Sequence, residues 1–186
     1  MHRLIPVLLF LAPPFWEAKP PERWSITEIG LLRVASPWAQ QVGPAPPVEV
    51  YFATARPIEE AETELRIRSK SPPAPPDPDY LTYLSANRDH VFVLAIPYQY
   101  LPNIKEEDEK RMSEESVMVI GRKSYHMLGH FPPVATDPVL RMVFPREIQP
   151  TDKRVVFKLY VPGVEFPDRQ VDFPVKDLAY HGKLEV

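Results

Sequence analysis

His126 and His130 are the best-spaced candidate metal ligands in the chain. Two histidines four residues apart share one face of a helix and can hold one zinc ion. Gly129 lies between them and Pro132-Pro133 follow, so a helix is disfavoured here. In an extended segment the two imidazoles lie about 13 Å apart, which is too far for one ion. We therefore expect two loop or surface histidines and no cofactor, with a metal site at His126 and His130 as the alternative.

Hydrolytic chemistry has weaker support. Ser85, Asp89 and His90 supply the residue types of a nucleophile, an acid and a base, but no G-x-S-x-G turn presents the serine. The carboxylates between residues 106 and 115 lack the spacing of a calcium loop and are typical of a solvated face. The sequence thus leans towards a non-enzymatic protein and leaves an activity open.

Aromatic side chains are the best candidates for binding. Trp38, Tyr98 and Tyr100 could stack on sugars or act as hot spots for a protein partner, and Tyr98 and Tyr100 stand between Pro97 and Pro102. Packing in the core or at its rim is the simpler expectation for such residues. We predict binding of another exported or envelope protein, with a carbohydrate-binding or hydrolytic domain as the alternative.

The first eighteen residues have the layout of a secretory signal. Arg3 precedes an apolar run over residues 4–12, and a proline-rich segment follows. The run is shorter than the roughly 20 apolar residues of a membrane-spanning helix. Trp16-Glu17-Ala18 departs from the small-x-small cleavage pattern, so cleavage after Ala18 is one prediction and an uncleaved anchor is the other. The protein is expected to be secreted or periplasmic, or else anchored to a membrane through residues 1–18.

The composition of the chain limits the functions and the kinds of structure expected for residues 19–186. The net charge of the chain is −3 and its charges are interspersed, so nucleic-acid binding is not expected. The chain has no cysteine, which excludes thiol nucleophiles and thiolate metal sites. Its 25 prolines in 186 residues far exceed the usual share of about 5% and force short elements and stiff loops. Proline-rich loops are expected at residues 44–47 and 71–79.

Alternation of apolar and polar residues predicts strands along most of the chain. The last two long ones are separated by a Pro162-Gly163 turn, which predicts an antiparallel pair, and Pro174 predicts that the second is an edge strand. The predicted strands cover residues 48–53, 62–70, 91–96, 117–120, 139–144, 155–161, 169–175 and 183–186.

One segment favours a helix. Residues 105–116 are good helix formers, and Asn103 with Glu106 approximates a capping box, although a charged loop fits equally well. A helix over residues 58–68 would scatter Leu65 and Ile67, so we expect a strand there.

These elements together predict an all-β fold. Many short strands with at most one short surface helix are typical of a two-sheet antiparallel β-sandwich. Its topology would be immunoglobulin-like by analogy, without the Cys-Trp-Cys signature. We expect a single domain over residues 19–186, in contact with a membrane only through residues 1–18 if these are kept.

Overall fold

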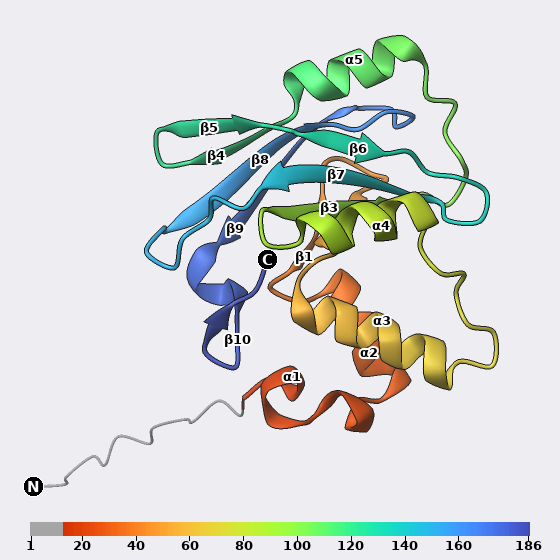
Figure 1. Cartoon of the computed structure of the whole chain (residues 1–186), viewed down its shortest axis with the longest axis vertical. Helices are drawn as coiled ribbons and strands as arrows, with labels where there is room; N and C mark the ends of the chain where they lie inside the picture. Colours follow the sequence, from red (N-terminus) through yellow and green to blue (C-terminus); the bar gives the residue numbers. More distant parts are fainter. Residues whose placement is uncertain (1–12) are drawn as a thin grey trace, which may run out of the picture.

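The structure is a computed structural model that describes residues 13–186 (Figure 1). It is 30% helical and about 32% strand, so the expected all-β sandwich with one short helix is wrong. Two antiparallel sheets pack together, and helices cover them. The helices are α1 (Phe15–Ala18), α2 (Ile26–Val34), α3 (Arg56–Arg68), α4 (Pro78–Asn87) and α5 (Glu106–Glu115), with 3-10 turns η1 (Pro21–Arg23) and η2 (Val175–Leu178).

Five strands form the larger sheet in the order β1-β2-β3-β7-β6, and every neighbouring pair is antiparallel. Strands β3 and β7 form its centre and pair along seven residues each, from Val91 opposite Pro145 to Pro97 opposite Val139. The predicted strands at residues 48–53, 91–96 and 139–144 are confirmed in this sheet. Its strands are β1 (Ala39–Val42), β2 (Val48–Phe52), β3 (Val91–Pro97), β6 (Gly129–Phe131) and β7 (Val139–Pro145).

The smaller sheet has the order β5-β4-β8-β9. Strands β8 and β9 are antiparallel, with Phe157 opposite Val171, and Gly163 turns between them at a φ of 74°. The predicted pair and its edge position at Pro174 are therefore confirmed. The strands are β4 (Val117–Ile120), β5 (Lys123–His126), β8 (Arg154–Tyr160) and β9 (Asp168–Pro174); a separate two-stranded ribbon joins β10 (Ala179–Tyr180) to β11 (Lys183–Leu184).

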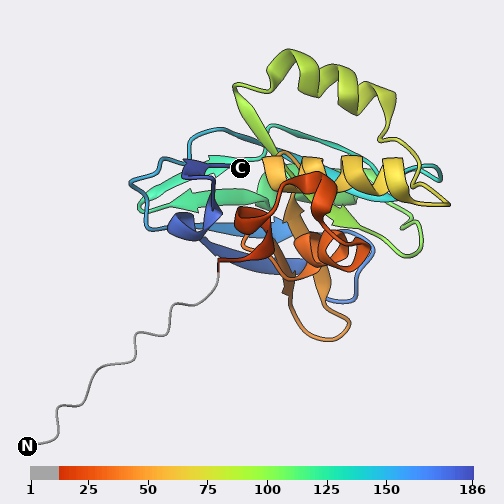
Figure 2. The ribbon, with the colours of Figure 1, turned by 90° about the horizontal axis from the view of Figure 1, so that it is seen from below.

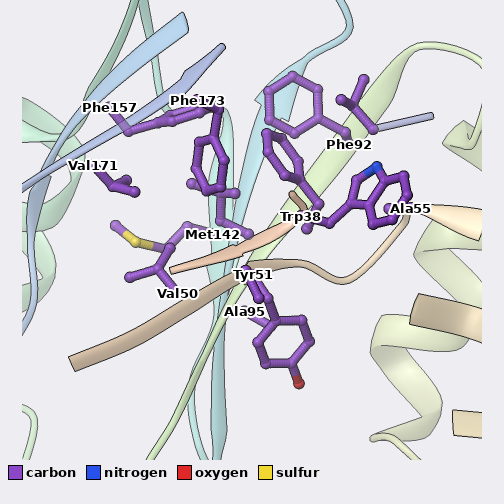
Figure 3. Close-up of a cluster of buried hydrophobic side chains, with 14 of the residues drawn as sticks. Trp38, Val50, Tyr51, Ala55, Phe92, Ala95, Met142, Phe157, Val171 and Phe173 are labelled. Carbon is purple, nitrogen blue, oxygen red and sulfur yellow. The ribbon is translucent and has the colours of Figure 1, made fainter. Parts of the chain in front are cut away.

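A cluster of phenylalanine rings joins the two sheets. Phe52, Phe92 and Phe144 come from the larger sheet, and Phe157 and Phe173 come from the smaller one, and all five are fully buried. Figure 3 shows several of these side chains converging from strands of both sheets. One continuous set of buried side chains therefore spans both sheets, while a smaller cluster packs α4 against the other face of the larger sheet through Val93 and Val143.

Residues 62–68 lie in α3, so the strand predicted over residues 62–70 is wrong. Ile58 and Ala61 are buried and Leu65 is half-buried, which makes one apolar stripe at helical spacing. Ile67 is exposed, so its alternation with Leu65 does not reflect burial. Three ion pairs between residues four apart also support the helix: Arg56–Glu60, Glu62–Arg66 and Glu64–Arg68.

Two other helices begin at caps that the strand interpretation overlooked. The Ser25 hydroxyl accepts from the Glu28 N–H at 3.1 Å, and the Glu28 carboxylate accepts from the Ser25 N–H at 2.7 Å, which is a capping box for α2. The Asp77 carboxylate accepts from the Asp79 N–H at 2.9 Å and caps α4. Asp77 lies at the end of the proline-rich segment 71–79, whose last residues therefore begin a helix.

Helix α5 is the one helix that the sequence predicted, and it is confirmed. It begins at Glu106 after Lys105, whose backbone N–H donates to the Asp108 carboxylate at 3.0 Å, so Asn103 is not the cap. Met112 is its buried residue, and the remaining side chains are mostly charged. In Figure 1 this helix lies at the opposite end of the molecule from α1 and α2.

The predicted signal peptide at residues 1–18 falls largely outside the described residues. Its last part is described and packs against the domain. The Phe15 and Trp24 ring centroids are 5.8 Å apart, and those of Trp16 and Trp38 are 6.0 Å apart. The Glu17 carboxylate accepts from the His181 N–H at 3.0 Å. Within residues 13–186 no helix has the length and apolar character needed to cross a bilayer.

Candidate functional site

A cleft of about 850 Å³ opens beside α3. The helix lines it with Arg56, Glu59, Glu60, Thr63 and Glu64. Spacings of three and four residues place these side chains on one face, while Ile58 and Ala61 point into the core from another. The packing of α3 therefore fixes a row of charges along the cleft. A volume of this size lies within the range of about 300–1,000 Å³ that ligand sites occupy.

Four other segments complete the cleft. Glu22 lies in η1, and Arg88 and Asp89 lie in the loop between α4 and β3. Arg146 directly follows β7, and Glu185 directly follows β11. The lining thus holds six carboxylates and three guanidinium groups. We call this set the acidic cleft: Glu22, Arg56, Glu59, Glu60, Glu64, Arg88, Asp89, Arg146 and Glu185.

Two of the arginines are already paired. Both terminal nitrogens of Arg88 donate to the Glu59 carboxylate, at 2.8 and 3.0 Å. The Arg56 Nε donates to Glu60 at 2.8 Å, and Glu60 also accepts from the Tyr180 hydroxyl at 2.6 Å. A bidentate pair of this kind fixes both side chains and leaves them less free to bind a ligand.

Three carboxylates of the cleft are not engaged. Within residues 13–186, the side chains of Glu22, Asp89 and Glu185 have no hydrogen bond or ion pair. Glu22 and Asp89 are exposed and Glu185 is half-buried, so their carboxylates are open to a ligand in the cleft. Arg146 is the one guanidinium of the cleft that has no hydrogen bond or ion pair to residues 13–186. Its Nε is buried, and burial lowers its pKa. The charges of Glu185 and Asp89 act in the opposite direction and favour its charged form.

A second, smaller cavity of about 390 Å³ lies between α3 and α4. Its wall includes Glu62, whose pKa is raised by burial, and Tyr80, whose pKa burial raises to about 12. The Arg141 guanidinium lies 4.4 Å from the centre of the Tyr80 ring and pairs with the Asp137 carboxylate at 2.6 Å. Glu62 pairs with Arg66 of its own helix, while Asp137 also accepts from the N–H of Asp77, the cap of α4.

The aromatic residues singled out for binding do not share a surface. Trp38 is fully buried, and its indole N–H donates to the Glu185 carbonyl at 2.8 Å. Tyr98 is half-buried, and its hydroxyl donates to the Pro162 carbonyl at 2.7 Å. Tyr100 is 80% exposed. The structure thus leaves Tyr100 as the one ring of the three that is open on its surface.

The candidate metal ligands lie on different sheets. His126 ends β5 in the smaller sheet, and His130 lies in β6 at the edge of the larger one. His126 is exposed, while His130 is half-buried opposite Met142 of β7. Among residues 13–186 no three metal-binding side chains gather in one place.

His130 should make the protein less stable in mild acid. Burial lowers its pKa below the usual 6.5, so the unfolded chain takes up a proton more readily than the folded one. Stability is therefore lost as the pH falls through 6.5 towards the pKa of the folded state. His130→Gln should lose less stability between pH 7 and pH 5 in urea unfolding than the parent protein does. His126→Gln controls for the loss of a surface histidine, and equal slopes for all three proteins would contradict the prediction.

The acidic cleft was not predicted from the sequence. Asp89 stood out only as one member of a triad of residue types, and Glu22, Arg146 and Glu185 lie in segments with no motif. Even the capping signals that would have identified α2 and α4 do not show which charges meet. The five segments of the cleft are far apart in the chain and come together only in the fold.

No family model matches the chain, and no curated protein and no solved structure shows significant similarity to it. Its function is therefore inferred from the cleft, the surface and the sequence of the N-terminal segment.

Proposed function

We propose that the chain is an exported, non-enzymatic binding protein whose acidic cleft takes a positively charged segment of another exported or envelope protein. Export is supported by the sequence of residues 1–18, in which Arg3 precedes an apolar run. Binding is supported by the cleft, which has the size and the shape of a ligand site.

The observation that carries this proposal is the charge balance of the cleft. Its lining has three more carboxylates than guanidinium groups, and within residues 13–186 the carboxylates of Glu22, Asp89 and Glu185 have no hydrogen bond or ion pair. A lysine or arginine side chain entering the cleft would gain charge-assisted hydrogen bonds from them. Electrostatic complementarity of this kind steers association and selects partners of opposite charge.

The alternative of carbohydrate binding gains no support from this cleft. Sugar sites commonly place an aromatic ring against the ring of the sugar. Among residues 13–186, those that line the acidic cleft include no Trp, Tyr or Phe. A cationic ligand therefore fits the lining better than a neutral sugar does.

Binding of a fluorescein-labelled hexalysine peptide to the full chain tests the proposal. In fluorescence anisotropy at physiological ionic strength, where distant exposed charges are screened, we expect the double substitution Asp89→Asn and Glu185→Gln to weaken binding about tenfold, which corresponds to about 1.4 kcal/mol. Both substitutions keep the shape of the side chain and remove its charge, and within residues 13–186 neither side chain makes a hydrogen bond that would be lost.

The matched control is the pair Glu106→Gln and Glu107→Gln. These residues are exposed at the start of α5, and they change the net charge of the protein by the same amount. We expect their effect on the Kd to be less than about twofold, since exposed charges act weakly at a distance. Equal weakening by both pairs would mean that hexalysine responds to net charge and not to the cleft, and would overturn the proposal.

A further inference from the structure

Helix α2 carries an apolar face that the domain does not cover. Ile29 and Leu32 point into the core, while Ile26, Leu31 and Val34 are 52%, 41% and 39% exposed. With 3.6 residues per turn, the three exposed side chains fall within an arc of about 140°. Gly30 lies within the same arc, and a side chain there would meet only open space. The exposed Thr27 is the polar residue within this arc, so this nine-residue helix is mostly apolar on its exposed side as well as on its buried side, as helices covered on both sides are.

The chain enters the domain beside this helix. The Phe15 ring packs against Trp24, two residues before α2 begins, and the Trp24 indole N–H donates to the Lys19 carbonyl at 3.0 Å. Figure 1 and Figure 2 both show α1 next to α2, and Figure 1 shows both on the side of the molecule away from α5. The described chain therefore begins on the side of the domain that carries α2, so a membrane-bound N-terminal segment would tether that side to the bilayer.

The contacts of residues 15–17 argue that the N-terminal segment is kept. Cleavage after Ala18 would remove the Phe15 and Trp16 rings from their places against Trp24 and Trp38. It would also remove the Glu17 carboxylate that accepts from the His181 N–H. A mature chain that keeps Phe15 and Trp16 can also keep the apolar residues 4–12, because nothing in the sequence between them matches a small-x-small cleavage site.

We propose that the exposed face of α2 lies in the surface of a lipid bilayer, next to an inserted N-terminal segment. Residues 4–12 are too few to span a bilayer but are apolar enough to enter one. An apolar helix face held parallel to the surface adds buried apolar area to such a weak anchor. The α2 face itself presents no basic cluster, so its contact is hydrophobic and does not depend on anionic lipid. This inference does not rest on the acidic cleft.

Labelling at α2 tests the contact directly, because the chain contains no cysteine and a single one can be introduced. Full-length Leu31→Cys carries an environment-sensitive NBD dye, and Ser113→Cys on exposed α5 carries the same dye as the control. Each protein is mixed with phosphatidylcholine vesicles that contain nitroxide-labelled lipid. We expect the dye at position 31 to be quenched several-fold more than the dye at position 113.

A second pair of variants measures the strength of the contact. Ile26→Ser with Leu31→Ser should weaken partitioning into phosphatidylcholine vesicles about tenfold in co-sedimentation, since two apolar side chains no longer leave water. Leu101→Ser with Leu128→Ser removes two exposed apolar side chains elsewhere and should leave partitioning unchanged. Thermal unfolding followed by circular dichroism shows that each variant is folded.

Three results would overturn the proposal. The full chain could fail to bind the vesicles, or it could bind with equal quenching at positions 31 and 113. The dye at position 31 could also be shielded from water without lipid in a protein that sediments as a dimer, in which case a second copy covers α2.

Discussion

Replacing Phe157 by alanine is expected to destabilise the protein by about 3–5 kcal/mol, the usual cost of removing a buried phenylalanine. The ring is fully buried on β8, and four other rings surround it. Its centroid lies 5.2 Å from that of Phe144, 5.8 Å from those of Phe52 and Phe92, and 6.2 Å from that of Phe173. Alanine leaves a cavity between two sheets that cannot collapse without shifting both.

The size of the effect follows from the position of Phe157 between the sheets. A domain of this size is stable by only about 5–15 kcal/mol, so the loss is a large part of the total. Urea unfolding followed by circular dichroism measures it, and Tyr100→Ala is the control because that ring is exposed and its loss should cost less than about 0.5 kcal/mol. A loss below about 1 kcal/mol for Phe157→Ala would show that the two sheets do not share one core.

Breaking the Asp137–Arg141 pair should cost a similar amount. Asp137 accepts from Arg141 at 2.6 and 3.2 Å and from the Asp77 N–H at 2.9 Å, and both charged side chains are over nine-tenths buried. Asp137→Asn leaves the Arg141 guanidinium buried without its carboxylate. Removing one member of a buried pair typically destabilises a protein by about 3–5 kcal/mol, because the remaining charge is uncompensated.

The double variant Asp137→Asn with Arg141→Met separates this cause from a loss of packing. Methionine removes the orphaned charge and keeps much of the side-chain volume, so most of the lost stability should return. Urea unfolding measures the free energy of unfolding of the parent, the single variant and the double variant. If the double variant is as unstable as the single one, then the lost contact with the Asp77 N–H, and not the orphaned charge, explains the effect.

The sequence predicted the strands better than the helices, because in the strands the apolar residues of the alternating pattern are the ones that are buried. In β8 the buried residues Val155, Phe157 and Leu159 are two apart, as the pattern requires. In α3 the alternation of Leu65 and Ile67 is accidental, since Ile67 is exposed. Both periods were present in that segment, and the ion pairs between residues four apart were the evidence that favoured the helix.

The composition also misled the prediction. Twenty-five prolines suggested that helices would be rare, yet Pro57 and Pro78 lie in the first turns of α3 and α4. Proline is favoured there because its missing N–H would have no partner within the helix. A proline count therefore limits the interior of helices and not their number. The caps at Ser25 and Asp77 carried the missing information in the sequence.

The pairing of β3 with β7 has a consequence for the order of folding. The β8–β9 hairpin closes over a short loop and can form within microseconds. The centre of the larger sheet must instead join residues 91–97 to residues 139–145, and contacts so distant in sequence form slowly. During synthesis, β1, β2 and β3 emerge long before β7 does. The N-terminal half of the chain is therefore made before the strand that pairs with β3, and its unpaired strand edge is prone to aggregation during that interval.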